Sequence, residues 1–204
     1  MKKATETEII EEIYMRRNEI ISNISRESID VYLWLKNEYK KINVENNTVF
    51  QFIFRSYYRL DSAGLGEKLK NRYFELLNRK ENNLGIILDE LSKIPTTKNQ
   101  FTVQYSFATK LIHTIDNNKP IYDNEVAAVI HRTVVGHNVK ARIESAKEVY
   151  AYLKNLYTEL INDGKIKKVI TQFRSRFGSD TKNITDQKTL DFLIWSLGKL
   201  KRKK

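Results

Sequence analysis

Proline and glycine are scarce in this chain, and that scarcity constrains its fold more than any motif does. Only 2 prolines and 7 glycines occur in 204 residues. A fold of many short strands needs frequent tight turns, and those turns rely on these two residue types. The sequence therefore predicts an all-α protein, a compact bundle of about nine or ten helices with short connections and no significant sheet.

The predicted helices follow one another without a long linker. The chain is 41% apolar and 30% charged, as expected of a folded protein with a full core. We expect residues 1–204 to form a single helical domain or two closely packed helical lobes. Residues 199–204, "KLKRKK", are expected to form a flexible basic tail.

Capping residues and apolar spacing locate several helices. Thr5 and Glu8 have the spacing of a capping box at the start of the first helix. Gly164 and Gly178 follow amphipathic stretches and are expected to end them. The segment 47–60 is apolar almost all round, which predicts a central buried helix.

Several classes of chemistry are absent from the sequence. There is no cysteine, which excludes disulfides, thiol catalysis and cysteine-ligated metals. No Gly-rich phosphate loop or HExxH motif occurs, and His113, His131 and His137 lack further ligands at metal-binding spacing. We expect no cofactor and no metal.

The N-terminus has no apolar run typical of a signal peptide, and no segment approaches the ~18 apolar residues needed to span a bilayer. The sequence therefore predicts a cytoplasmic protein with no membrane partner.

The positive charge is concentrated at the C-terminal end. The formal net charge is +11, and residues 165–204 contain 12 lysines and arginines against Asp180, Asp186 and Asp191. This asymmetry indicates a surface that faces a polyanion, and nucleic acid fits better than an anionic membrane because no strongly amphipathic anchor accompanies it. The alternative is that the lysines only keep the protein soluble.

Two segments carry the candidate nucleic-acid contacts. In "KIKKVITQFRSRF", Lys167, Lys168, Arg174 and Arg176 are spaced to form a basic outer face over an apolar inner one, suited to phosphate contact.

In "FRSYYRLDSAGL", Arg55 and Arg59 flank Tyr57 and Tyr58 on one predicted helix, an arrangement suited to phosphates or an extruded base. The alternative is an internal ion pair between Arg59 and Asp61, which are close in sequence.

Lys110 and Asp123 are the candidate catalytic residues. Lys110 lies among apolar neighbours such as Phe107 and Leu111, and a partly desolvated lysine can act as an amine nucleophile. Asp123, beyond a polar turn, is placed to orient that amine or stabilise positive charge. The alternative is structural: Lys110 is a solvated helix residue and Asp123 caps the next helix.

The stretch "TKLIHTIDNNKPIYDNEVAAVIHRT" resembles the core of the helix-hairpin-helix DNA glycosylases, the endonuclease III superfamily. The resemblance implies that Lys110 attacks the sugar C1′ as an amine and that Asp123 assists departure of the base. Pro120 matches the family's turn, and Arg132-Thr133 match the end of the next helix. The family's Gly-x-Gly, whose amides bind a DNA phosphate, is replaced here by "SFAT".

Two hypotheses follow. The first is a DNA-binding protein with glycosylase or lyase activity in base excision, and hence in DNA repair. The second is a non-enzymatic helical module that binds nucleic acid or a protein, with Lys110 and Asp123 in structural roles.

Overall fold

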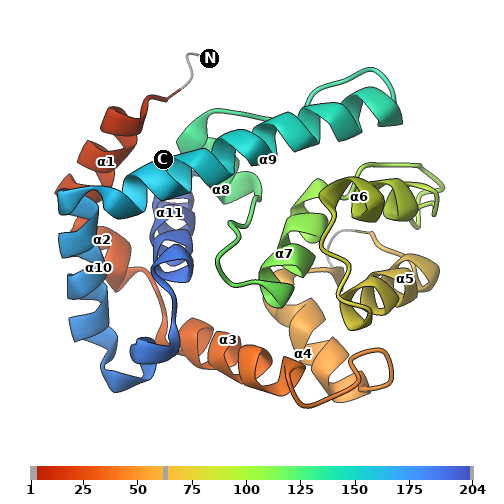
Figure 1. The fold of residues 1–204 in the computed structure, drawn as a ribbon, viewed down its shortest axis with the longest axis horizontal. Helices are drawn as coiled ribbons and strands as arrows, with labels where there is room; N and C mark the ends of the chain where they lie inside the picture. The colour runs from red at the N-terminus through yellow and green to blue at the C-terminus, as the bar shows by residue number, and fades with distance from the viewer. Residues whose placement is uncertain (1–3, 62–63, 203–204) are drawn as a thin grey trace. The chain divides into compact units, whose positions relative to one another are not determined.

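The computed structural model of the protein describes residues 4–61 and 64–202 (Figure 1). These residues form eleven α-helices and one 3-10 helix, and they contain no β-strand, which confirms the all-α prediction. The first predicted helix is two helices, α1 (Glu6–Met15) and α2 (Arg17–Ser22). They are separated at Arg16, whose φ of −97° and ψ of 11° depart from helical geometry.

The chain forms two compact units, each built from separated segments. Unit 1 consists of residues 1–26, 117–133 and 148–204, and unit 2 of residues 27–116 and 134–147. The long helix α9 (Val139–Asn162) contributes its residues up to Lys147 to unit 2 and the remainder to unit 1.

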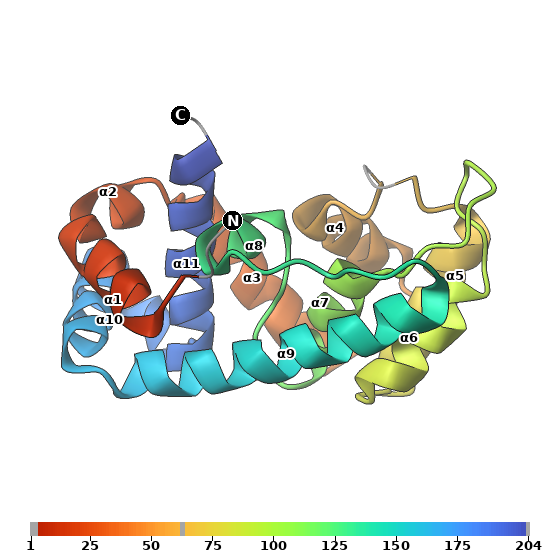
Figure 2. The same ribbon diagram turned by 90° about the horizontal axis from the view of Figure 1, so that it is seen from above.

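In unit 1 the C-terminal helix α11 (Asp186–Arg202) lies among other helices of the unit, as Figures 1 and 2 show, and packs against several of them. These are α1, α2, α8 (Asn124–Ile130) and α10 (Gly164–Phe177); the short η2 (Ser179–Asn183) connects α10 to α11. A stripe of large apolar residues explains why α11 is so well buried. Its fully buried side chains include Leu190, Leu193, Ile194 and Leu197.

In unit 2 the helices α5 (Glu67–Asn78), α6 (Leu84–Ser92) and α7 (Tyr105–Ile115) pack against one another. The unit also contains α4 (Thr48–Tyr58) and α3 (Arg26–Tyr39) from Glu27 onward. Aromatic side chains fill its core around Phe54. The ring centroid of Phe54 lies 4.7 Å from that of Tyr58, 5.9 Å from that of Tyr73 and 5.7 Å from that of Phe74.

The prediction of a helix buried all round at 47–60 is wrong. Only Phe50, Phe54 and Tyr58 of α4 are buried, at a four-residue spacing that defines a single face. Val49 and Phe52 are each 62% exposed. The apolar composition of α4 therefore exceeds what its packing requires.

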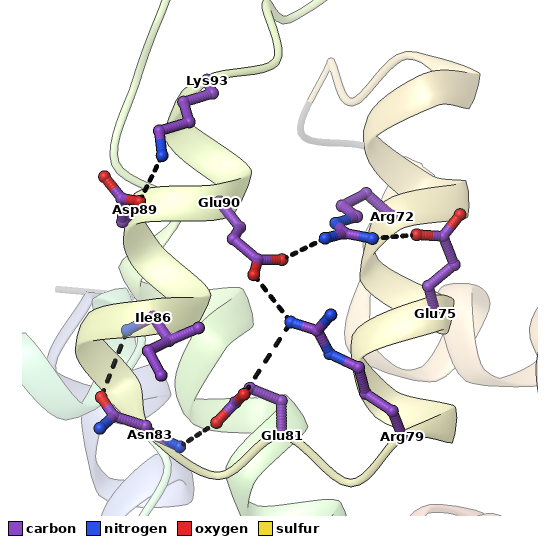
Figure 3. A network of polar contacts seen from close by, with 9 residues as sticks. All are labelled: Arg72, Glu75, Arg79, Glu81, Asn83, Ile86, Asp89, Glu90 and Lys93. Atoms are coloured by element: carbon purple, nitrogen blue, oxygen red, sulfur yellow. Dashed lines mark hydrogen bonds and ion pairs between the residues drawn. The ribbon is translucent and has the colours of Figure 1, made fainter.

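A network of ion pairs connects α5 to α6 (Figure 3). Glu90 of α6 accepts a hydrogen bond from Arg79, the residue that caps the C-terminal end of α5, and forms an ion pair with Arg72 of α5. The N–O distance is 2.7 Å in both contacts. Arg72 also pairs with Glu75, and Arg79 lies 3.9 Å from Glu81.

The helix ends test the capping predictions. The capping box at Thr5 and Glu8 is confirmed, and so is Gly178, which ends α10 with a φ of 78°. Gly164 does not end α9; it is the first residue of α10, because the Asp163 side chain caps that helix. Residues 199–202 of the predicted tail form the last turn of α11, and residues 203–204 lie outside the described residues.

Candidate nucleic-acid interface

Helix α10 of unit 1 has one apolar and one polar side, as its sequence predicts. Ile166, Val169, Ile170, Phe173 and Phe177 are buried at helical spacing. The Phe173 ring lies 6.0 Å from that of Phe192 on α11, centroid to centroid. This packing fixes which side of α10 faces solvent.

The polar side of α10 carries five basic residues, and the helix contains no acidic residue. Two of the five are held by carboxylates from other segments of unit 1. Lys165 pairs with Glu11 of α1. Arg174 donates to Asp186 Oδ1 at 2.7 Å and to the carbonyl of Ile184 at 3.3 Å. Arg174 is therefore a structural residue that joins α10 to the start of α11, although its spacing predicted phosphate contact.

The other three basic residues, Lys167, Lys168 and Arg176, are exposed. Within the described part of the chain, none of them has a carboxylate oxygen within 4.0 Å. We call these three residues the α10 basic face. Their charges are available to an external anion.

Part of the remaining C-terminal charge is paired with carboxylates within unit 1. Lys201 pairs with Glu12 at 2.6 Å, and Arg202 pairs with Glu125 at 2.8 Å. Lys199 lies over the Trp195 ring, 4.5 Å from its centroid. The last turn of α11 is thus attached to α1 and α8, and the formal charge of residues 165–204 overstates the charge free to bind a partner.

Arg55 and Arg59, the two residues of unit 2 predicted to contact nucleic acid, have different environments. Arg55 donates to Asp61 at 3.2 Å, and Lys70 pairs with the same carboxylate at 2.9 Å. Hydrogen bonds from Lys70 and Arg55 lower the pKa of Asp61. The predicted internal partner of Asp61 was Arg59; the structure has Arg55 there instead. Arg59 is exposed and ends α4 in the left-handed conformation, with a φ of 58°.

Lys110 is buried rather than solvated. It lies in the middle of α7 in unit 2 and is 8% exposed. Its Nζ donates to the carbonyl of Tyr58 at 3.3 Å and lies 5.0 Å from the ring centroid of Phe107. The view of Lys110 as an ordinary surface residue is therefore wrong, and its amine lies in an aromatic environment.

Asp123 belongs to unit 1 and caps α8. Its Oδ1 accepts from the backbone N–H groups of Glu125 and Val126, both at 3.0 Å. The capping role expected for Asp123 is confirmed.

A buried polar cluster of unit 1 was not predicted from the sequence. Lys188 Nζ lies 2.7 Å from Asp191 Oδ2, and both side chains are almost fully buried. Tyr157 of α9 is fully buried, and burial together with the charges of Asp191 and Asp123 raises its pKa well above its ordinary value. The sequence feature that could have revealed this cluster is a lysine and an aspartate three residues apart within an apolar helix.

An open groove of about 730 Å³ lies between α6 and α9 in unit 2. Phe101, Val139 and Ile143 form its apolar part, and ion pairs border it on both sides, Lys93 with Asp89 and Lys147 with Glu144. No residue predicted to bind or react lies in this groove.

Comparisons of the chain with protein-family models, curated proteins and solved structures find no match. Within residues 4–61 and 64–202, no helix is long and apolar enough to cross a membrane. The same residues contain no group of three histidine or carboxylate side chains arranged to hold a metal ion.

Proposed function

We propose that this chain is a DNA-binding protein whose α10 basic face contacts phosphates. The observation that carries the proposal is the charge of α10, which has five cations and no acidic residue, with Lys167, Lys168 and Arg176 exposed. Such a cluster releases condensed counterions when it binds a polyanion, and this release favours binding. Compensated cations such as Arg174 and Lys201 contribute little because they already have carboxylate partners.

The salt dependence of DNA binding tests the proposal. The triple variant Lys167→Gln, Lys168→Gln, Arg176→Gln is expected to bind duplex DNA more weakly. Its slope of log K against log salt should be shallower by about 2.7, because each phosphate contact contributes about 0.9. Fluorescence anisotropy with a labelled duplex, measured from about 50 to 200 mM salt, gives both quantities.

A second triple variant provides a control of equal charge. Lys40, Lys68 and Lys98 are exposed lysines of unit 2. Replacing all three by glutamine removes the same charge and should leave the salt slope nearly unchanged. Equal losses in the two triple variants would mean that net charge alone drives binding. Absence of binding by the wild type at low salt would end the proposal.

A second candidate function is base-excision chemistry, favoured by the burial of Lys110 against Phe107 and Tyr58. In this reaction the neutral amine attacks C1′ of an abasic sugar in its aldehyde form, and loss of water gives an imine. Borohydride reduces the imine to a stable amine that links protein and DNA.

Borohydride trapping on abasic-site DNA tests this chemistry. Lys110→Arg retains a buried cation but cannot form the imine, so it should abolish the trapped product. Lys188→Arg, a change at another buried lysine, should not. Asp123→Asn preserves a capping side chain, and it should still be trapped because the base has already left. A wild type that is not trapped, or Lys110→Arg trapped as well as the wild type, would exclude Lys110 as the nucleophile.

A further inference from the structure

We infer that the α10 basic face binds the sugar-phosphate backbone of double-stranded DNA without reading its base sequence. The inference rests on the proposed function and specifies its substrate. Three features of α10 support it: the state of its N-terminus, the chemistry of its exposed side chains, and the position of its aromatic residues.

The N-terminus of α10 is already occupied by an anion of the protein. Asp163 Oδ1 accepts from the backbone N–H groups of Lys165 at 2.7 Å and Ile166 at 3.1 Å. A free helix N-terminus attracts phosphate through these groups and the helix dipole. In helix-turn-helix proteins, the N-terminal residues of the recognition helix also reach the base edges. The carboxylate of Asp163 disfavours both phosphate binding at the N-terminus of α10 and contact of that N-terminus with base edges. Helix α10 therefore contacts DNA through the side chains on its solvent-facing side.

The side chains on the solvent side of α10 offer few groups that read bases. Amide side chains read adenine, but the Gln172 amide donates to Asn18 Oδ1 at 2.7 Å. The Thr171 hydroxyl donates to the carbonyl of Lys167 at 2.9 Å. What remains is largely cationic, and Lys167 and Lys168 carry compact ammonium charges that contact phosphates without base preference.

The aromatic residues of α10 are unavailable for stacking. Single-stranded nucleic acid is usually held by bases stacked on exposed aromatic side chains. The two aromatic residues of α10, Phe173 and Phe177, are buried in unit 1. The α10 basic face therefore suits a duplex, whose bases are already stacked and whose phosphates are exposed.

Competition between nucleic acids of equal length tests the inference. Duplexes of A·T pairs only, G·C pairs only and mixed sequence should bind the wild-type chain with dissociation constants within about threefold of one another. Single-stranded DNA should bind several-fold more weakly. The substitution Ser175→Lys adds a cation at an exposed position of the same side. It should tighten binding to every duplex equally and steepen the salt slope by about 0.9.

Different outcomes separate the two proposals. A tenfold preference for one duplex sequence would overturn the inference but leave the proposal of DNA binding intact. If the preferred duplex were G·C, Arg176 would be the residue to examine, because arginine reads guanine. Tighter binding to single-stranded DNA or to duplex RNA would also overturn it. Failure to bind any of the nucleic acids at low salt would instead reject the proposed function.

Discussion

At the scale of single residues, Gly198 is the position where α11 depends most on the absence of a side chain. A Cβ atom built on Gly198 would lie 2.2 Å from the carbonyl oxygen of Glu125 and 2.6 Å from its carbonyl carbon. The obstacle is the backbone of α8, which cannot rotate away as a side chain can. Glycine therefore sets how closely α11 and α8 approach each other.

Gly198→Ala should destabilise the protein by about 1–3 kcal/mol, the usual cost of forcing extra volume into a packed interface. Urea unfolding followed by circular dichroism measures the change. Gly164→Ala is the matched control, since a Cβ there meets nothing within 4 Å and the residue is helical. It should be neutral or stabilise by up to about 1 kcal/mol. Equal effects of the two changes would show that the α8–α11 contact is looser than the structure has it.

At the scale of helices, the ion pairs that connect α5 to α6 in Figure 3 converge on the carboxylate of Glu90. One carboxylate serves both Arg72 and Arg79. Its partial burial raises the pKa of Glu90, but hydrogen bonds from Arg79 and Arg72 and their charges outweigh that effect and lower it. By contrast, neighbouring Asp89 makes one exposed pair with Lys93.

Glu90→Gln should lower the free energy of unfolding by about 1 kcal/mol at neutral pH, and Asp89→Asn by less than about 0.5 kcal/mol. Because the pKa of Glu90 is lowered in the folded state, its contribution is full above the ordinary glutamate value. It is lost as the pH falls through the lowered pKa. Unfolding curves of wild type and Glu90→Gln, measured from pH 7 down to about 3, should therefore converge. A constant difference would point to packing instead of charge.

At the scale of the whole molecule, the basic C-terminal region separates into cations that hold the fold and cations that face outward. Lys201 and Arg202 attach α11 to α1 and α8 through Glu12 and Glu125. Lys167 and Lys168 are exposed, and the structure gives them no carboxylate partner in the described part of the chain. Net charge alone cannot distinguish these roles.

Two double variants should separate the roles. Lys201→Gln with Arg202→Gln is expected to cost about 0.5–1 kcal/mol of stability, since exposed pairs are partly screened by solvent, with little effect on the DNA salt slope. Lys167→Gln with Lys168→Gln should leave stability unchanged and make the slope shallower by about 1.8. The free energy of unfolding and the DNA affinity are measured for both double variants. If each double variant changed both properties, this division of roles would be contradicted.

The sequence by itself determined the helical class, because scarce glycine and proline leave few turns. It also determined local features such as the Thr5 capping box, the Asp123 cap and the apolar stripe of α10. These depend on neighbours within one or two helical turns. The burial of Lys110 and the partners of Arg174 and Lys201 were decided only by the tertiary structure. The carboxylate partners of Arg174 and Lys201 belong to other helices, so the local sequence does not reveal them. Periodicity also does not show which apolar residues, such as Val49 and Phe52 on α4, will remain exposed.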